Sequence, residues 1–185
     1  MLEAPEARQR ERFFWSRIIL RDVITPLIIA FILAGFAQAT VAKPYQIPSG
    51  SMLPTIQLQD RILANRLVYW IHGVERGDVI VFTPPQGVDQ TTPYVKRVVG
   101  LPGDTVEVRN GKTMVNGEEF VVPSAMTPNY TYSRITVPDD SLFVLGDNRN
   151  ESSDSHIWGF VPMNNIIGRA DVVYWPLKDI HLLGL

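Results

Sequence analysis

Hydrophobic residues follow two different patterns along this chain. Residues 23–42 contain no charged side chain, whereas after residue 43 short apolar segments alternate with turns rich in glycine, proline and Asn-Gly. No long segment after residue 43 has the 3.6-residue period of an amphipathic helix. The pattern therefore predicts one apolar helix followed by a mostly β body.

Four apolar segments of the body have the length and boundaries of strands: residues 79–82, 94–99, 141–145 and 171–174. Since short strands bury their edges best when the sheet closes on itself, we expect a curled or partly closed antiparallel β-sheet.

Two Asn-Gly dipeptides, at 110–111 and 116–117, separate alternating segments. Asn-Gly is the strongest short hairpin signal, so residues 104–122 are predicted to form a three-stranded meander. Residues 123–133 are polar and contain prolines, which indicates a surface loop. Together these features predict a hairpin and loop insertion over residues 104–140.

The apolar segment 23–42 is long enough to cross a membrane. As an α-helix, roughly 20 residues span the ~30 Å hydrocarbon core of a bilayer. The basic residues near it are Arg8, Arg10, Arg12, Arg17 and Arg21 before the segment and Lys43 after it. The positive-inside bias then predicts a cytoplasmic segment 1–22, a transmembrane anchor 23–42 and an exported body 43–185.

A cleavable secretory signal is the alternative for this segment. A basic flank, an apolar run and Ala37-Gln38-Ala39 are the elements of such a signal. The long polar region before the run, and its continuation to Ala42, favour the anchor. Both interpretations export the body.

Composition excludes several classes of function. A chain of 185 residues provides one domain beside the helix. The net charge of −2 gives no basic field of the kind that binds nucleic acid. The absence of cysteine excludes disulfides, zinc-thiolate sites and a cysteine nucleophile.

A turn with two serines follows the apolar segment. In Pro48-Ser49-Gly50-Ser51, glycine permits backbone geometry that a Cβ would forbid. Such a turn is able to present a serine hydroxyl beside backbone N–H groups, as a nucleophile with its oxyanion hole requires. Ser-Gly-Ser is also common in ordinary loops, so this motif alone does not identify a nucleophile.

Lys96 lies beside Arg97 on the predicted strand 94–99. Strand alternation places Lys96 on the same side as Tyr94 and Val98, and Arg97 on the other side. If the lysine faces inward, desolvation lowers its pKa and makes a neutral amine available as a base, which arginine cannot supply. If it faces outward, Lys96 is an ordinary exposed charge, and the pattern leaves both alternatives open.

Four segments, in this order, resemble the boxes of the bacterial type I signal peptidases: residues 48–55, 76–82, 94–104 and 146–162. They cover most of the chain, and the N-terminal apolar span fits the same family. His156 stands where many members carry arginine, and Asn150 where aspartate is frequent. These departures resemble the cyanobacterial and thylakoid branch.

The resemblance implies a membrane-bound serine endopeptidase that removes signal peptides from exported preproteins. It would act on the outer side of the plasma or thylakoid membrane, with preproteins and the lipid bilayer as partners. Ser51 would be the nucleophile and Lys96 the general base. The hydroxyl of Ser49 and the N–H of Ser51 would form the oxyanion hole.

Further roles follow from the same resemblance. Ser152 would orient the lysine, and Asp147 and Asp154 would hold the last loop in place. Cleavage would follow small residues in an Ala-x-Ala pattern. The apolar pockets for these residues would be formed by Tyr45, Ile47, Met52, Ile56, Ile62, Val81, Tyr94 and Val95. Plain core packing is the alternative role for each of these side chains.

Histidine offers two other kinds of site. Asp154, His156 and Ser51 suggest a Ser-His-Asp triad, but Asp and His two residues apart on one loop rarely converge in that way. His72 and His181 add no metal-ligand spacing. We therefore expect no metal and no cofactor.

Two other functions also fit an exported β body. A self-cleaving Ser-Lys peptidase related to transcriptional repressors would carry a DNA-binding helical segment, and none is predicted. A non-catalytic β module would not need intact Ser51, Lys96 and Ser152. Trp70-Ile71 and the tail 180–185 are candidates for contact with the bilayer surface, and the sequence predicts no oligomeric state.

Overall fold

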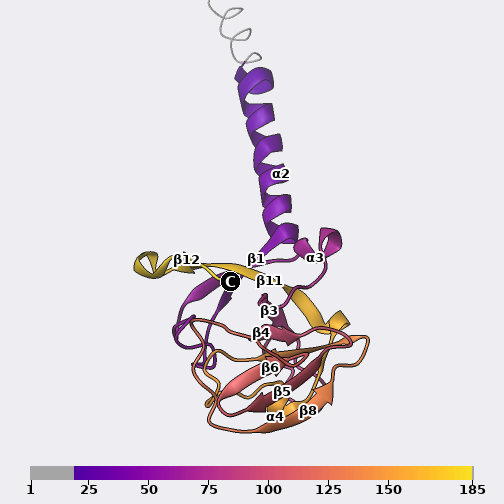
Figure 1. The fold of residues 1–185 in the computed structure, drawn as a ribbon. Helices are drawn as coiled ribbons and strands as arrows, with labels where there is room; N and C mark the ends of the chain where they lie inside the picture. The colour runs from indigo at the N-terminus through magenta and orange to yellow at the C-terminus, as the bar shows by residue number, and fades with distance from the viewer. Residues whose placement is uncertain (1–18, 185) are drawn as a thin grey trace, which may run out of the picture. The chain divides into compact units, whose positions relative to one another are not determined.

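The computed structural model describes residues 19–184 (Figure 1). The chain divides into two compact units, Met1–Val41 and Ala42–Leu185. Most of the predicted cytoplasmic segment 1–22 therefore lies outside the described residues.

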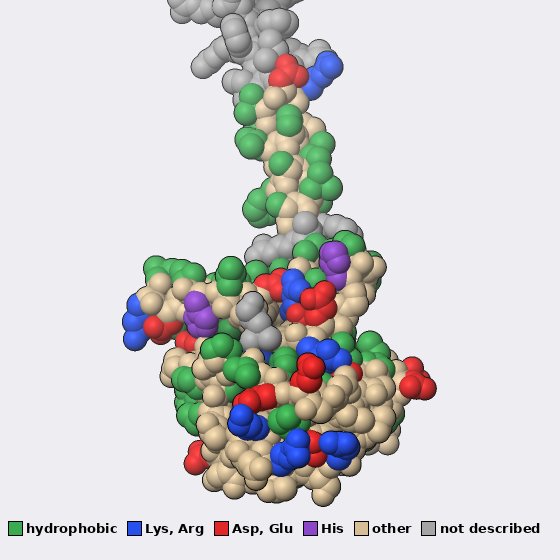
Figure 2. Space-filling view, viewed as in Figure 1, with side chains coloured by type: hydrophobic (Ala, Val, Ile, Leu, Met, Phe, Trp, Pro, Cys, Tyr) green, Lys and Arg blue, Asp and Glu red, His purple; other side chains and the backbone are tan. Residues whose placement is uncertain are grey.

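The first unit contains a π-helical turn, η1 (Ile19–Ile24), and the helix α2 (Thr25–Val41). Hydrophobic side chains are exposed along α2 (Figure 2). Among the side chains of α2 that the structure describes, Phe31 is the most exposed hydrophobic one, at 81%. Within residues 19–184, no helix combines the length and the apolar character needed to cross a membrane. The span predicted for residues 23–42 is not found as such a helix, because α2 has 17 residues and is about 26 Å long at 1.5 Å per residue.

The body is built on one large antiparallel sheet. Its strands lie in the order β1 (Ala42–Gln46), β2 (Arg61–Asn65), β11 (Ile166–Trp175), β3 (Val79–Phe82), β4 (Tyr94–Gly100), β9 (Ser141–Leu145) and β10 (Val161–Pro162), with β12 (His181–Leu182) paired to β11. Register shifts interrupt β11 and β4 and curl the sheet. The predicted mostly β, curled antiparallel body is confirmed.

A second, smaller sheet has the order β7 (Glu118–Glu119), β6 (Lys112–Val115), β5 (Thr105–Arg109) and β8 (Tyr132–Thr136). Both Asn-Gly turns have positive φ at both residues, for example 52° at Asn110 and 72° at Gly111. That is the backbone of a type I′ hairpin turn, and the predicted meander forms. The loop predicted for residues 123–133 ends earlier, because β8 begins at Tyr132 and pairs with β5.

Short helices connect the strands: α3 (Val68–Ile71), α4 (Ser155–Trp158), η2 (Met163–Asn165) and η3 (Leu177–Asp179). The last predicted strand, 171–174, is the end of the ten-residue β11. Within β11, Gly168 lies against the backbone of Asn65, where a Cβ would not fit.

Strand β3 is buried on both faces and places its neighbour β4 in the interior. Val79 and Val81 belong to one hydrophobic cluster, and Ile80 and Phe82 to another. Because β4 pairs with β3 and β9, its basic residues enter the core of the body rather than its surface.

Candidate active site

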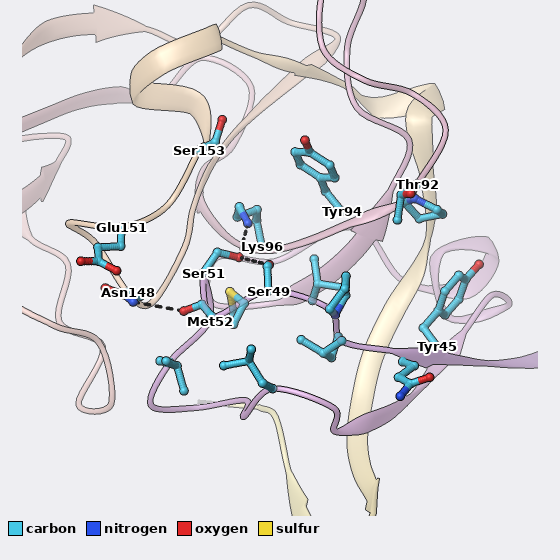
Figure 3. Close-up of a pocket in the computed structure, with 18 residues that line it drawn as sticks. Tyr45, Ser49, Ser51, Met52, Thr92, Tyr94, Lys96, Asn148, Glu151 and Ser153 are labelled. Carbon is cyan, nitrogen blue, oxygen red and sulfur yellow. Dashed lines mark hydrogen bonds between the residues drawn. The ribbon is translucent and has the colours of Figure 1, made fainter.

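Ser51 and Lys96 meet although 45 positions separate them in the sequence (Figure 3). Ser51 lies in the turn between β1 and β2, and Lys96 extends from β4. The Lys96 Nζ lies 2.6 Å from the Ser51 Oγ. A neutral amine at this distance is able to accept the hydroxyl proton.

The Lys96 side chain faces inward and is 3% exposed. Ile80 is its cross-strand partner, and the Tyr94 ring lies 5.5 Å from its Nζ. Burial lowers the pKa of Lys96 to about 8, although the charges of Asp154 and Asp147 act in the opposite direction. The sequence pattern left the inward and outward orientations of Lys96 open, and in the structure the side chain faces inward.

Arg97 points to the other face of β4 and is also buried. Its Nε and Nη2 donate to the two carboxylate oxygens of Asp147, at 2.9 and 2.7 Å. The guanidinium also donates to the Gly77 carbonyl. Neighbouring residues of one strand thus have separate tasks, since Lys96 reaches Ser51 and Arg97 fixes the loop that begins at Gly146.

The loop after Gly146 also holds the turn that contains Ser49 and Ser51, which we call the serine turn. The Asn148 N–H donates to the Ser51 carbonyl, and its side-chain amide to the Gly50 carbonyl, both at 3.1 Å. Thr55 Oγ1 donates to Asp147. A Cβ on Gly146 would overlap the Ser51 carbonyl and Ser152, so only glycine allows this approach.

Asp154 is fully buried and organises the end of the loop. One carboxylate oxygen accepts from the Gly146 N–H at 2.9 Å, and the other lies 2.7 Å from His156 Nδ1. The His156 ring stacks on Tyr130 at 4.3 Å. Asp154 and His156 thus pair with each other, but among the described residues His156 forms no hydrogen bond with Ser51. The hydrogen bond to the Ser51 hydroxyl comes instead from Lys96.

The supporting serines are placed differently from one another. The Ser49 and Ser51 hydroxyl oxygens are 3.4 Å apart, so the Ser49 side chain lies beside the candidate nucleophile. Ser152 is buried beside Gly146, and its Oγ has no hydrogen-bond partner among the described residues. The contact with Lys96 expected for Ser152 is therefore not formed as a hydrogen bond.

A cleft of about 650 Å³ opens in front of Ser51. The predicted pocket residues that line it are Tyr45, Ile47, Met52, Tyr94 and Val95. Three others do not line it, because they are fully buried in the same hydrophobic cluster: Ile56, Ile62 and Val81. Between residues 19 and 184, no three His, Asp or Glu side chains gather as metal ligands.

Several residues that position other side chains of the site were not predicted from the sequence. For Arg97 the sequence did contain a signal, since it is a second basic residue directly after Lys96 on a strand that is mostly apolar. Asn148 and Thr55 had none, because a polar residue in a loop gives no indication of its partner. Leu53, Leu58 and Glu151 also line the cleft and were not predicted.

Comparison with known proteins gives consistent matches. The family model described as signal peptidase, peptidase S26, matches residues 20–175. Signal peptidase I of Leptolyngbya laminosa is 43% identical over an alignment of 173 positions, which covers 89% of this chain and 84% of that protein. The probable signal peptidase I-1 of Synechocystis sp. is 43% identical over 174 residues, 89% of this chain and 87% of that protein. The probable thylakoidal processing peptidase 2 of Arabidopsis thaliana is 40% identical over 152 residues, 77% of this chain and 41% of that protein.

Proposed function

The chain belongs to the signal peptidase family of peptidase S26, and from this membership we propose that it removes N-terminal signal peptides from exported preproteins with a Ser51-Lys96 dyad. The observation that carries the proposal is the 2.6 Å contact between the Lys96 Nζ and the Ser51 Oγ. An exposed lysine, with a pKa of about 10.4, would have almost no neutral amine at neutral pH, whereas burial lowers the pKa of Lys96 to about 8 and raises its neutral fraction to roughly a tenth at pH 7.

In the first step, neutral Lys96 takes the Ser51 proton while the Ser51 Oγ attacks the carbonyl carbon of the scissile peptide bond. Negative charge develops on the carbonyl oxygen, and the Ser49 hydroxyl and the Ser51 N–H are the donors that would stabilise it. The resulting lysine ammonium then gives its proton to the leaving amine as the C–N bond breaks. The mature protein leaves, and the signal peptide remains esterified to Ser51.

In the second step, water is the attacking group, in the place that the mature protein has left. Neutral Lys96 takes a proton from the water, and the hydroxide attacks the ester carbonyl. The ester bond breaks, the ammonium returns the proton to Ser51, and the signal peptide leaves as a carboxylic acid.

The proposal includes cleavage after small residues in an Ala-x-Ala pattern. The apolar cleft residues Ile47, Met52 and Val95 support it, because charged side chains would lose hydration there without gaining a partner. Small side chains enter such a cleft at little cost.

The proposal also places the reaction at a plasma or thylakoid membrane, on the outer side. Bacterial and thylakoidal relatives support membrane association. The exposed Leu, Ile and Phe side chains of α2 favour contact with lipid, because the exposure of apolar surface to water is unfavourable in free energy.

Cleavage of a purified preprotein by the full chain in detergent tests the proposal. Ser51→Ala should leave the thermal unfolding temperature within a few degrees and abolish nearly all activity, because it deletes one hydroxyl on a turn. Ser49→Ala should cost roughly 10²- to 10³-fold if its hydroxyl is an oxyanion donor. Equal, small losses at both positions would place the nucleophile elsewhere.

A further inference from the structure

The cleft has two chemically different sides around Ser51 (Figure 3). The side with Tyr45 and Thr92 is mostly apolar, since Tyr45 and Val95 pack on the hydrophobic cluster that contains Ile47. On the other side the lining is polar and comes from the loop after Gly146: Asn148, Glu151 and Ser153.

Glu151 is the single acidic residue among those that line the cleft, and Lys96 is the single basic one. Lys96 is buried, whereas Glu151 is exposed. The side-chain amide of Asn148 is already bonded to the Gly50 carbonyl. The Glu151 carboxylate forms no ion pair with any residue of the described range 19–184. Its negative charge is therefore available to a chain bound in the cleft.

The direction of the substrate follows from the proposed function, on which this inference rests. The small residues before the cleaved bond occupy the apolar side, so the residues after it pass Ser51 toward the polar side. Cleavage also releases a new α-amino group there, which is mostly protonated at neutral pH. On this path, the mature segment and the new terminus pass the side of the cleft that Glu151 lines.

We propose that Glu151 selects preproteins by the charge of the first residues of the mature chain. It favours Lys or Arg, and disfavours Asp or Glu, at the first two positions after the cleaved bond. Since Glu151 is exposed, water and salt screen its interactions, and we expect a change in kcat/KM of about twofold to fivefold for one unit of charge.

Three peptide substrates test the inference with the full chain. They share one signal segment and carry Lys-Lys, Gln-Gln or Glu-Glu directly after the cleavage site. The wild-type protein should cleave them in that order of kcat/KM. Glu151→Gln should bring the three values together, and Glu151→Lys should reverse their order. About 1 M salt, which reduces the screening length to ~3 Å, should weaken the wild-type preference.

Glu118→Lys is the matched control, because it changes the net charge equally at an exposed position of β7 in the second sheet. It should keep the wild-type order. If both Glu151 variants keep that order, or if Glu118→Lys reverses it as Glu151→Lys does, Glu151 is not the selecting residue. If the wild-type protein cleaves none of the peptides, Gln-Gln included, the proposed function fails and this inference fails with it.

Discussion

At the scale of single residues, the site depends on the different hydrogen-bond partners of two neighbouring basic side chains. Both Lys96 and Arg97 are buried, at 3% and 1% exposure. The Arg97 guanidinium donates two hydrogen bonds to the Asp147 carboxylate. Lys96 meets a hydroxyl instead, so burial favours its neutral form.

The identity of the base is tested by substitution of Lys96 and His156. Lys96→Arg keeps a positive charge but cannot lose its proton, so activity should fall at least ~10³-fold, as for Lys96→Ala. His156→Ala should keep substantial activity, because His156 contacts Asp154 and Tyr130 rather than the Ser51 hydroxyl. The measurement is kcat/KM for one preprotein between pH 6 and pH 10.

In the wild-type protein, activity should rise with an apparent pKa of about 8. The opposite result would be an inactive His156→Ala variant together with an active Lys96→Arg variant. That result, or a profile centred near pH 6.5, would assign the base to histidine.

The same lysine should make stability depend on pH. Its pKa is about 8 in the folded chain and 10.5 when unfolded, so between these values the unfolded chain binds more protons. Stability should therefore rise with pH across this window, by up to about 3 kcal/mol, and stay reduced below pH 8. Urea unfolding of the wild-type chain and of Lys96→Met, from pH 7 to 10, measures the difference. A difference between the two that does not change with pH would mean that Lys96 is not desolvated.

At the scale of elements, the serine turn and the loop after β9 form one unit. The turn has few strand hydrogen bonds of its own, and Asn148, Thr55 and Gly146 join it to the loop. Arg149 extends this support to the second sheet, since its Nη1 donates to Thr113 on β6. The meander thus supports the active-site loop, because Thr113 on β6 accepts the hydrogen bond from Arg149.

Gly146→Ala tests the unit. The added methyl would overlap the Ser152 side chain and the Ser51 carbonyl, which belong to the linked loop and turn. We expect a loss of stability of roughly 1–3 kcal/mol and a much larger loss of activity than of substrate affinity. Thermal unfolding and a separation of kcat from KM measure the two effects. Gly117→Ala is the control, because open space surrounds its Cβ position and its positive φ alone adds strain. Equal losses of kcat in the two variants would argue against a linked turn and loop.

At the scale of the whole molecule, the proposal requires the N-terminal segment and the body to be on opposite sides of a membrane. Protease added to spheroplasts should digest residues 44–185 and spare a tag at the N-terminus. Arginines before residue 23 favour this orientation. Protection of the body, or a mature chain that begins at Thr40, would contradict the uncleaved topology.

The sequence alone was sufficient for features with local causes. Asn-Gly turns specify their own backbone, so the meander was predictable, and a short run of β-branched residues indicates a buried strand, as in β3. The resemblance to the signal peptidases indicated Ser51 and Lys96 because its boxes keep their order along the chain. Strand alternation further predicted that Lys96 and Arg97 occupy different environments.

Only the tertiary structure decided which environments these are. The pairing of β4 between β3 and β9 made Lys96 a buried amine and supplied Asp147 to Arg97. The tertiary structure also buries Ile56, Ile62 and Val81 in the hydrophobic cluster and places Glu151 in the lining of the cleft. The physical reason is that burial, charge pairing and pKa depend on contacts between residues tens of positions apart, and such contacts leave no periodic signal in the sequence.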